Sequence, residues 1–236
     1  ELPEPFLALL KQHLRKLRPD ALLLGEVWED ASNKKAYDIR RRYFVDAELD
    51  SVMNYPFRQA ILQFLLQGGR DAFFNTILSV VENYPPQVLR LLMNHIGTHD
   101  TERVLTILGN PHKVRENSFA YNAVQEKLRL TDEERARGVK LLKMISALQF
   151  TLFGFPCVYY GDEAGMTGGR DPFNRGAYPW DNAATELVDF YSKLGKLRKN
   201  PAFSGGEYIP YFSGLGYIVF SRKNGDNEVL VAVNRW

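Results

Sequence analysis

Two clusters of ionisable residues in this 236-residue sequence have the types and spacing that acid–base chemistry requires. The first is Glu26, which follows the apolar run 22–24 and stands two residues before Trp28. A carboxyl group between a strand end and an indole is expected to be partly desolvated, which raises its pKa and suits a general acid. The alternative interpretation is a strand-end carboxylate in a salt bridge.

The second cluster contains His99 and Asp100. A neutral imidazole can hydrogen-bond to a hydroxyl group, and an adjacent carboxylate can bind sugar hydroxyls or stabilise a developing positive charge. Equally, Asp100 or Thr101 could cap the helix that follows. His95 and His99 have a spacing seen in metal sites, but Gly97 argues against a helix that would bring them together, so we predict no metal site.

Two further polar segments could take part in binding. Asp162 and Glu163 follow an apolar run and could hold a hydrophilic ligand or pair with Arg170. Asp171 and Arg175 lie in a Gly-rich, aromatic loop that runs from 165 to 180. Aromatic rings near these segments could stack on sugars, although such aromatics are more often core residues. The aromatic candidates are Trp28, Tyr159, Tyr160, Phe173, Tyr178 and Trp180.

The apolar periodicity predicts helices and short buried strands that alternate over about 200 residues, which favours an α/β fold with a parallel sheet. The expected helices cover 1–19, 56–66, 71–83, 101–108, 131–152 and 185–198. A polar loop at 109–116 is expected to follow the helix at 101–108. The expected strands cover 21–24, 50–54, 88–93 and 156–160. Cys157, inside the last strand, is expected in the core. The polar clusters fall where strands end, which is where (β/α)₈ barrels carry their chemistry.

The end of the chain differs from the rest. Segments 217–222 and 228–233 alternate apolar and polar residues on either side of Asn224 and Gly225, which predicts a β-hairpin. We therefore divide the chain into residues 1–203, a barrel part, and 204–236, the first strands of a C-terminal β-sandwich domain.

Composition excludes several classes of protein. The sequence is 45% hydrophobic and 25% charged, which is typical of a globular fold, and its net charge of +2 gives no nucleic-acid footprint. No apolar run approaches the roughly 20 residues of a membrane helix. The single cysteine, Cys157, permits a reducing compartment, so a cytoplasmic location is favoured but not established. Phosphate-loop, dinucleotide and Gly-x-Ser-x-Gly motifs are absent from the sequence.

Together these motifs resemble the alpha-amylase family of glycoside hydrolases, in its neopullulanase, cyclomaltodextrinase and maltogenic amylase branch. Segments 24–28, 50–55, 94–101 and 154–163 resemble the ends of the fifth, sixth, seventh and eighth barrel strands, and 171–175 resembles the loop that follows. The resemblance implies the second half of a (β/α)₈ barrel, strands five to eight, followed by the start of a C-terminal antiparallel β domain.

The resemblance also implies retaining hydrolysis, or transfer, of α-1,4-glucosidic bonds in starch-type oligosaccharides or cyclodextrins. Glu26 would protonate the leaving oxygen and then activate water, and Asp100 would stabilise the transition state. The implied substrate-binding residues are His99, Trp28, Asp171 and Arg175. The alternative is a non-catalytic fragment that binds α-glucans.

The sequence departs from the family at one decisive point. The family's nucleophilic Asp belongs to a fourth-strand segment that is not found here, and the arginines at 40–42 lie on the wrong side of Glu26 to replace that segment. We therefore expect a fragment that is inactive by itself and needs no cofactor, although calcium could bind elsewhere in the full-length protein. Half a barrel would leave sheet edges unpaired, which predicts a homo-oligomer, with an α-glucan or maltooligosaccharide as ligand and no nucleic-acid or membrane partner.

Overall fold

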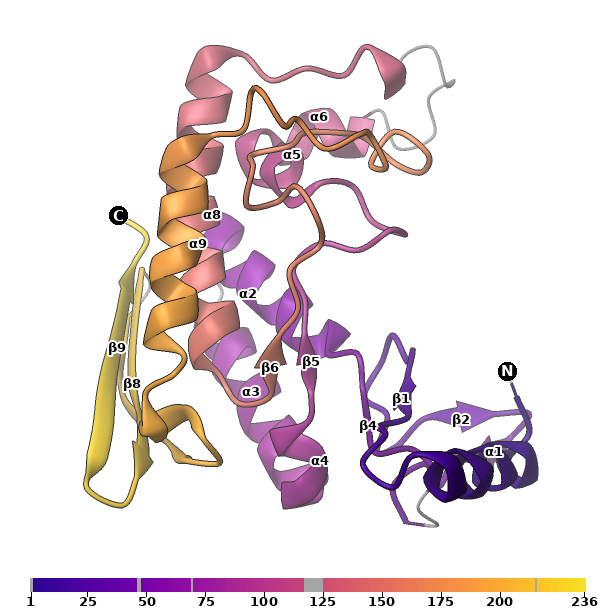
Figure 1. Cartoon of the computed structure of the whole chain (residues 1–236). Helices are drawn as coiled ribbons and strands as arrows, with labels where there is room; N and C mark the ends of the chain where they lie inside the picture. The colour runs from indigo at the N-terminus through magenta and orange to yellow at the C-terminus, as the bar shows by residue number, and fades with distance from the viewer. Residues whose placement is uncertain (1, 46–47, 69, 117–124, 215) are drawn as a thin grey trace.

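The computed structural model describes residues 2–45, 48–68, 70–116, 125–214 and 216–236. Helices and short strands alternate as far as α9, and an antiparallel sheet follows (Figure 1). The helices are α1 (Glu4–Leu17), α2 (Tyr55–Gln67), α3 (Arg70–Asn83), α4 (Pro86–Arg90), α5 (Val104–Gly109), α6 (Pro111–Glu116), α8 (Asp132–Thr151) and α9 (Thr185–Leu197), with the 3₁₀ helix η1 (Pro201–Phe203). The strands are β1 (Leu24–Gly25), β2 (Lys35–Ala36), β3 (Ile39–Arg40), β4 (Ser51–Val52), β5 (Met93–Asn94), β6 (Phe155–Pro156), β7 (Glu207–Ser213), β8 (Tyr217–Asn224) and β9 (Asn227–Asn234).

Four short strands run parallel and position the polar clusters. β1 pairs with β4, Leu24 opposite Ser51, and β5 pairs with β6, Met93 opposite Phe155. A parallel bridge between Met53 and Met93 joins the two pairs, which gives the order β1-β4-β5-β6. The carboxyl ends of these strands therefore lie at one edge, and the predicted α/β class is confirmed.

Helix α8 begins at the capping box that the sequence predicts. The hydroxyl oxygen of Thr131 accepts from the backbone N–H of Glu134 at 3.2 Å, and the Glu134 carboxylate accepts from the Thr131 N–H at 2.8 Å. Helix α8 packs closely on α5, because a Cβ atom on Gly138 would lie only 3.1 Å from the Cα atom of Gly109. This close contact fixes α5, which directly follows the loop of His99 and Asp100.

Two segments have a different secondary structure from the one predicted, and both lie next to prolines. Residues Val88–Arg90, predicted as strand, belong to helix α4, and strand β5 begins only at Met93. Segment 109–116, predicted as a loop, contains helix α6, which opens at Pro111. The side-chain Oδ1 atom of Asn110 accepts from the backbone N–H of Lys113 at 2.8 Å and caps that helix. Proline fits the first turn of a helix, where its missing N–H costs nothing, so here it starts helices.

The parallel ladders are shorter than the apolar runs suggest. Strand β6 ends at Pro156, and Cys157 beyond it is half-buried and not in the core as predicted. The Cys157 N–H donates to the Asn94 carbonyl at 2.7 Å, which continues the pairing of β6 with β5 for one residue. Since each ladder is short, side-chain contacts must supply much of the order at the strand ends.

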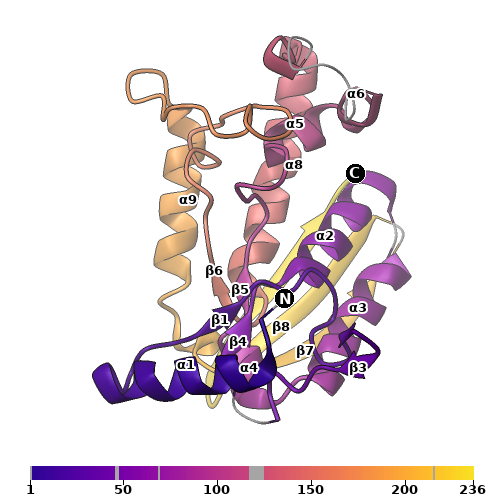
Figure 2. The same cartoon turned by 90° about the vertical axis from the view of Figure 1, so that its right-hand side faces the viewer.

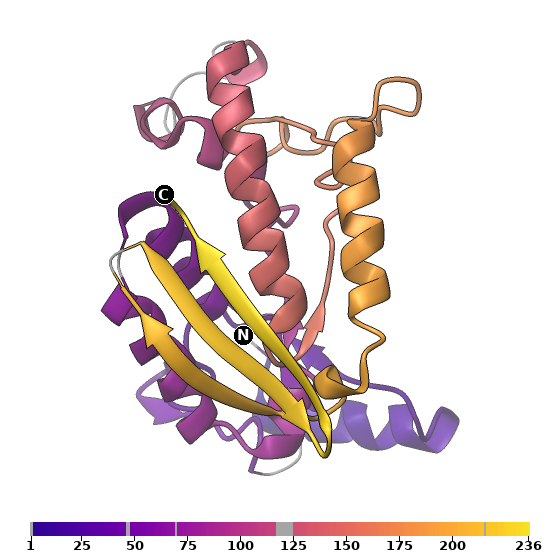
Figure 3. The same cartoon turned by 90° about the vertical axis from the view of Figure 1, so that its left-hand side faces the viewer.

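The C-terminal sheet has the order β7-β8-β9 and contains the predicted hairpin at Asn224. β7 was not predicted. The sheet lies against the helical part of the chain (Figures 2 and 3), and Ile218, Phe220 and Val231 belong to the same buried cluster as core residues of that part. The division of the chain at residue 203 stays a prediction.

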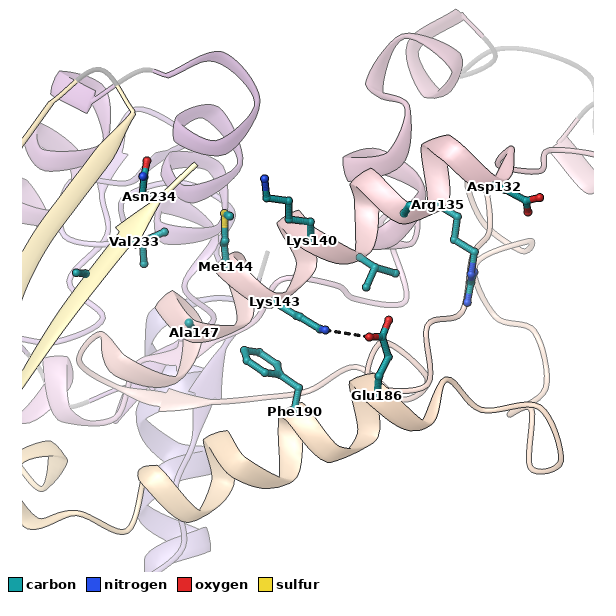
Figure 4. A pocket seen from close by; sticks show the side chains of 13 residues that line it. Asp132, Arg135, Lys140, Lys143, Met144, Ala147, Glu186, Phe190, Val233 and Asn234 are labelled. Carbon is teal, nitrogen blue, oxygen red and sulfur yellow. Dashed lines mark hydrogen bonds and ion pairs between the residues drawn. The ribbon is translucent and has the colours of Figure 1, made fainter. Parts of the chain in front are cut away.

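A groove of about 820 Å³ lies between α8, α9 and β9 (Figure 4). An ion pair between Lys143 Nζ and Glu186 Oε2, 3.1 Å apart, spans it. None of the predicted site residues lines this groove. In the part of the chain that the structure describes, no helix is long and apolar enough to cross a bilayer.

Candidate active site

Tyr55 lies at the centre of the candidate site. It begins helix α2 just after β4, and its side chain is only 5% exposed. The phenol O–H donates to Glu26 Oε1 at 3.2 Å, and the ring stacks on Trp28 with centroids 4.4 Å apart. The edge of His95, which follows β5, meets the same ring at 4.3 Å. One tyrosine thus joins residues from the ends of three neighbouring strands.

The electrostatics of Tyr55 connect the two predicted catalytic residues. Burial raises the pKa of Tyr55 to about 12; a hydrogen bond with Thr98 opposes this, and the carboxylates of Glu26 and Asp100 add to it. The phenol therefore stays protonated and remains a hydrogen-bond donor at neutral pH. Glu26, after β1, hydrogen-bonds to this phenol, and Asp100, in the loop after β5, lies near enough for its charge to act on it.

The charged residues predicted to bind substrate form a second group next to Asp100. His99 Nε2 lies 3.0 Å from Asp100 Oδ2, and Arg175 Nη2 lies 3.6 Å from Asp100 Oδ1. Arg175 Nε also contacts Asp171 Oδ1 at 2.6 Å. The structure therefore brings together four residues that the sequence places in two separate segments.

The surroundings of Glu26 differ from the expectation. The sequence predicts partial desolvation by the neighbouring indole, but the Glu26 side chain is exposed. The indole of Trp28 instead stacks on the ring of Tyr55. Trp28 is itself 52% exposed, so part of the indole remains available to a ligand.

Buried amide side chains, which the sequence analysis missed, hold the strand ends in place. Asn54 Nδ2 donates to Asn94 Oδ1 at 2.8 Å, and Asn94 Nδ2 donates to the Phe153 carbonyl at 2.6 Å. Gln149 of α8 donates to the carbonyls of Asn94 and Cys157. These bonds compensate for the short ladders because they link β4, β5, β6 and α8. Polar residues inside otherwise apolar strand segments were the available signal.

A buried ion pair lies beneath the site. The side chains of Arg103 and Asp162 are fully buried, with Arg103 Nη1 3.1 Å from Asp162 Oδ1. Burial raises the pKa of Asp162 to about 7, and the Arg103 guanidinium opposes this rise. Gly97 is needed here, since a Cβ atom would lie 2.4 Å from Asp162 Oδ2. The sequence left pairing with Arg170 open; the structure gives Asp162 the partner Arg103.

The other predicted sugar platforms have different neighbours. The guanidinium of Arg103 lies over the rings of Tyr159 and Tyr160, 4.3 and 4.7 Å from their centroids. Tyr178 and Trp180 contact each other at 4.7 Å, and Trp180 is 83% exposed. Tyr159 and Tyr160 are therefore engaged with Arg103, whereas Trp28 stacks on Tyr55 within the site.

We expect His95 to make the chain less stable in acid. Burial lowers the pKa of His95 to about 4, although the hydrogen bond with the Met93 carbonyl acts to raise it. An unfolded imidazole titrates near 6.5, so lowering the pH through that value protonates the unfolded chain first and favours it. The loss at pH 5 is about 2 kcal/mol. Urea unfolding at neutral pH and near pH 5 measures it.

His95→Gln is the control for this prediction. The variant lacks the titrating ring but keeps every other ionisable group, including Asp162, so the difference between the two proteins isolates His95. An identical pH dependence of the free energy of unfolding in both proteins would show that His95 is not held neutral by the fold.

Within residues 2–45, 48–68, 70–116, 125–214 and 216–236, no group of three or more His, Cys, Asp or Glu side chains is placed to hold an ion. The expectation of calcium concerned the full-length protein and stays a prediction.

Comparison with known proteins shows the family. The model of the alpha amylase catalytic domain matches residues 4–129, which is more than half of the chain. The chain therefore belongs to the alpha-amylase family.

Individual relatives agree with this assignment. A cyclomaltodextrinase from Geobacillus thermopakistaniensis is 30% identical over all of this chain, and an amylopullulanase from Thermoanaerobacterium saccharolyticum is 32% identical. The ligand-free cyclic alpha-maltosyl-(1→6)-maltose hydrolase from Arthrobacter globiformis superposes on 99% of the chain with a TM-score of 0.76 and 27% identity.

These relatives are much longer than this chain. The chain spans 35% of the length of the cyclomaltodextrinase, 19% of that of the amylopullulanase and 46% of that of the Arthrobacter hydrolase. The comparisons thus confirm the α/β fold of an alpha-amylase catalytic domain, with an antiparallel sheet following it.

Proposed function

We propose that this chain supplies the acid/base side of the active site in a retaining α-glucan hydrolase. In this proposal β1, β4, β5 and β6 are the fifth to eighth strands of a (β/α)₈ barrel, and β7–β9 begin a C-terminal β domain. The observation that carries the proposal is the order β1-β4-β5-β6, which brings Glu26, Tyr55 and the loop of Asp100 to one edge, where the Tyr55 phenol donates to Glu26. The names of the relatives, a cyclomaltodextrinase and a cyclic alpha-maltosyl-(1→6)-maltose hydrolase, support a maltose-based glucan as the substrate class.

The proposed roles follow from the contacts. Glu26, oriented by the Tyr55 hydroxyl, donates its proton to the leaving glycosidic oxygen and later takes a proton from water. Asp100 stabilises the positive charge that develops on the sugar ring, and His99 binds hydroxyl groups. Trp28 offers an exposed indole for stacking, and Asp171 with Arg175 binds neighbouring glucose units.

We further propose that the chain by itself is inactive. The retaining route needs a nucleophilic carboxylate roughly 5 Å from the acid, and the family segment that carries it has no counterpart in this sequence. Self-association through the edges of the half-barrel, a cytoplasmic location and the absence of a cofactor, a nucleic-acid partner and a membrane partner remain predictions.

A non-catalytic glucan-binding role is the second candidate, and the exposure of Trp28 favours it. It uses Trp28, His99, Asp171 and Arg175 in the same way and leaves Glu26 without a chemical role. The two candidates therefore differ in whether sugar release depends on Glu26 once a complete barrel is present.

We expect the chain to bind maltotetraose weakly and Asp100→Asn to weaken that binding by about tenfold, because a carboxylate hydrogen-bonded to hydroxyls contributes about 1.5 kcal/mol or more. Isothermal titration calorimetry measures the dissociation constants. Asp226→Asn, an exposed aspartate in the β8–β9 turn, is the matched control and should not change affinity. Equal affinity in all three proteins, or no binding by the unaltered chain, would contradict the proposed site. Release of reducing sugar by the chain alone would contradict the missing nucleophile.

A further inference from the structure

We propose that Asn174 is a positioning residue that holds the two charged segments of the glucan site in register. One segment is the turn 98–101, which carries His99 and Asp100, and the other is the loop 171–175, which carries Asp171 and Arg175. The inference rests on the proposed function and deepens it, because it names the group that fixes the substrate-binding residues relative to one another.

The side chain of Asn174 is fully buried between these segments. Its Nδ2 group donates to the carbonyl oxygens of His99 and Thr101, both at 2.7 Å, and lies 3.5 Å from the Thr98 carbonyl. Both N–H donors of one amide are therefore used on two carbonyls of a single turn, those on either side of Asp100. The contact spans more than 70 residues of sequence, so the amide joins segments that no secondary-structure element connects.

The backbone of Asn174 is held as well. Arg103 Nε donates to the Asn174 carbonyl at 2.7 Å, and the Arg103 N–H donates to the Gly168 carbonyl at 3.2 Å. The loop is closed tightly at this point, since a Cβ atom on Gly168 would lie 2.3 Å from the Phe173 carbonyl oxygen. The backbone of Asn174 thus connects the loop 171–175 to Arg103, which follows Asp100 in the chain.

The charged contacts nearby are too exposed to fix the geometry. The side chains of Arg175, Asp100 and Asp171 are 44%, 36% and 53% exposed, and ion pairs between exposed side chains contribute little because water screens them. The buried amide is different, because its loss removes a buried donor from the Thr101 carbonyl and leaves the His99 carbonyl with the half-exposed Arg175 guanidinium as its donor. The buried hydrogen bonds therefore set the positions of the charged groups.

Asn174 lies next to Arg175, one of the residues proposed to bind the ligand. Arg175 follows Asn174 directly, and its Nε donates to the same His99 carbonyl, at 3.1 Å, that accepts from Asn174. A shift of the loop therefore moves the guanidinium relative to the Asp100 carboxylate. Groups that bind sugar hydroxyls lose much of their effect when they are misplaced by about 1 Å.

The test uses the full chain and maltotetraose as the probe. We expect Asn174→Ala to raise the dissociation constant at least about tenfold, and Asn174→Ser, which keeps one donor, to have a smaller effect. Asn224→Ala is the matched control, because Asn224 Nδ2 also donates to two carbonyls, those of Pro201 and Ser204, but does so at the C-terminal sheet. The control should change affinity by less than about twofold.

A double-mutant cycle separates positioning from general stability. If Asn174 acts through Arg175, then Asn174→Ala/Arg175→Ala should bind no more weakly than the worse of the two single variants, so the effects are not additive. Full additivity would overturn the inference, and so would unchanged affinity in Asn174→Ala when the unaltered chain binds.

Hydrogen exchange gives a readout that does not need a ligand. Asn174→Ala should accelerate exchange of the Asp100 and Arg175 amides, which bond to Thr98 Oγ1 and the Pro172 carbonyl, while amides of α8 stay unchanged. Uniform acceleration over the chain, or none at these two amides, would overturn the positioning role. Absence of binding by the unaltered chain combined with local acceleration would instead overturn the proposed function and leave the loop-to-turn coupling supported. Asn174→Ser serves for both measurements if the alanine variant does not fold.

Discussion

We expect Glu26→Gln to abolish most of the turnover of a completed barrel. The protein to test is a chimera of the Geobacillus cyclomaltodextrinase. In the chimera, this chain replaces the part of the cyclomaltodextrinase that aligns with it, and the alignment covers the whole of this chain. Glutamine keeps the size of the side chain and can still contact the Tyr55 hydroxyl, but it cannot donate the proton that the leaving oxygen needs. Loss of general acid–base catalysis lowers kcat by about 10²–10⁴-fold. Release of reducing sugar from a cyclodextrin measures it.

Glu29→Gln is the matched control for the Glu26 variant. Glu29 lies three residues further along the chain, is 59% exposed, and pairs with Lys34 at 2.7 Å. Its replacement removes the same charge while the hydrogen bond between Tyr55 and Glu26 stays in place, and it should leave kcat unchanged. A chimera whose activity is the same with Glu26 and with Gln at this position would leave the non-catalytic binding role as the better account of the site.

Arg103→Met is expected to be the most destabilising single substitution around the site. The guanidinium is fully buried, contacts Asp162 at 3.1 Å, and donates to the carbonyls of Asn174 and Tyr160. Removing it leaves a buried carboxyl group without a cation, which costs about 3–5 kcal/mol. Denaturant unfolding, followed by circular dichroism, measures the change.

The pH dependence of this variant identifies the cause. Burial raises the pKa of Asp162 and Arg103 opposes that rise, so loss of Arg103 makes the folded state hold its proton more tightly. The pKa of Asp162 is higher in the folded chain than in the unfolded chain, where it is near 3.9. The free energy of unfolding therefore falls as the pH rises from about 3.9 towards the pKa of the folded state. Arg103→Met should therefore be destabilised more near pH 8 than near pH 5.5. The double variant Arg103→Met/Asp162→Asn should lose that extra pH dependence.

Lys143→Met provides the matched comparison at the surface. Lys143 pairs with Glu186 at 3.1 Å across the groove of Figure 4, but both side chains are exposed to solvent, at 34% and 63%. Water screens such a pair, so its loss should cost about 1 kcal/mol or less. If Lys143→Met and Arg103→Met lowered the free energy of unfolding by similar amounts, the Arg103–Asp162 pair would not stabilise the fold as its burial implies.

The sequence by itself determined the features that depend on neighbouring residues. The capping box of Thr131 and Glu134, the hairpin at Asn224 and the alternation of helices with strands all come from contacts within a few residues, and all are confirmed. The strand-end segments of Glu26 and of His99 with Asp100 were recognisable for the same reason. The prolines at 86 and 111 were misread because the same residue ends one element and starts another.

The tertiary structure decided which side chains meet. Tyr55 contacts Glu26 across 29 residues, Arg103 pairs with Asp162 across 59, and Asn174 reaches the His99 carbonyl across 75. No local pattern specifies such pairs, because each depends on how strands with two-residue ladders and helices such as α5 and α8 pack together. The exposure of Glu26 was decided in the same way, since its indole neighbour could stack on Tyr55 only after β4 had been placed beside β1.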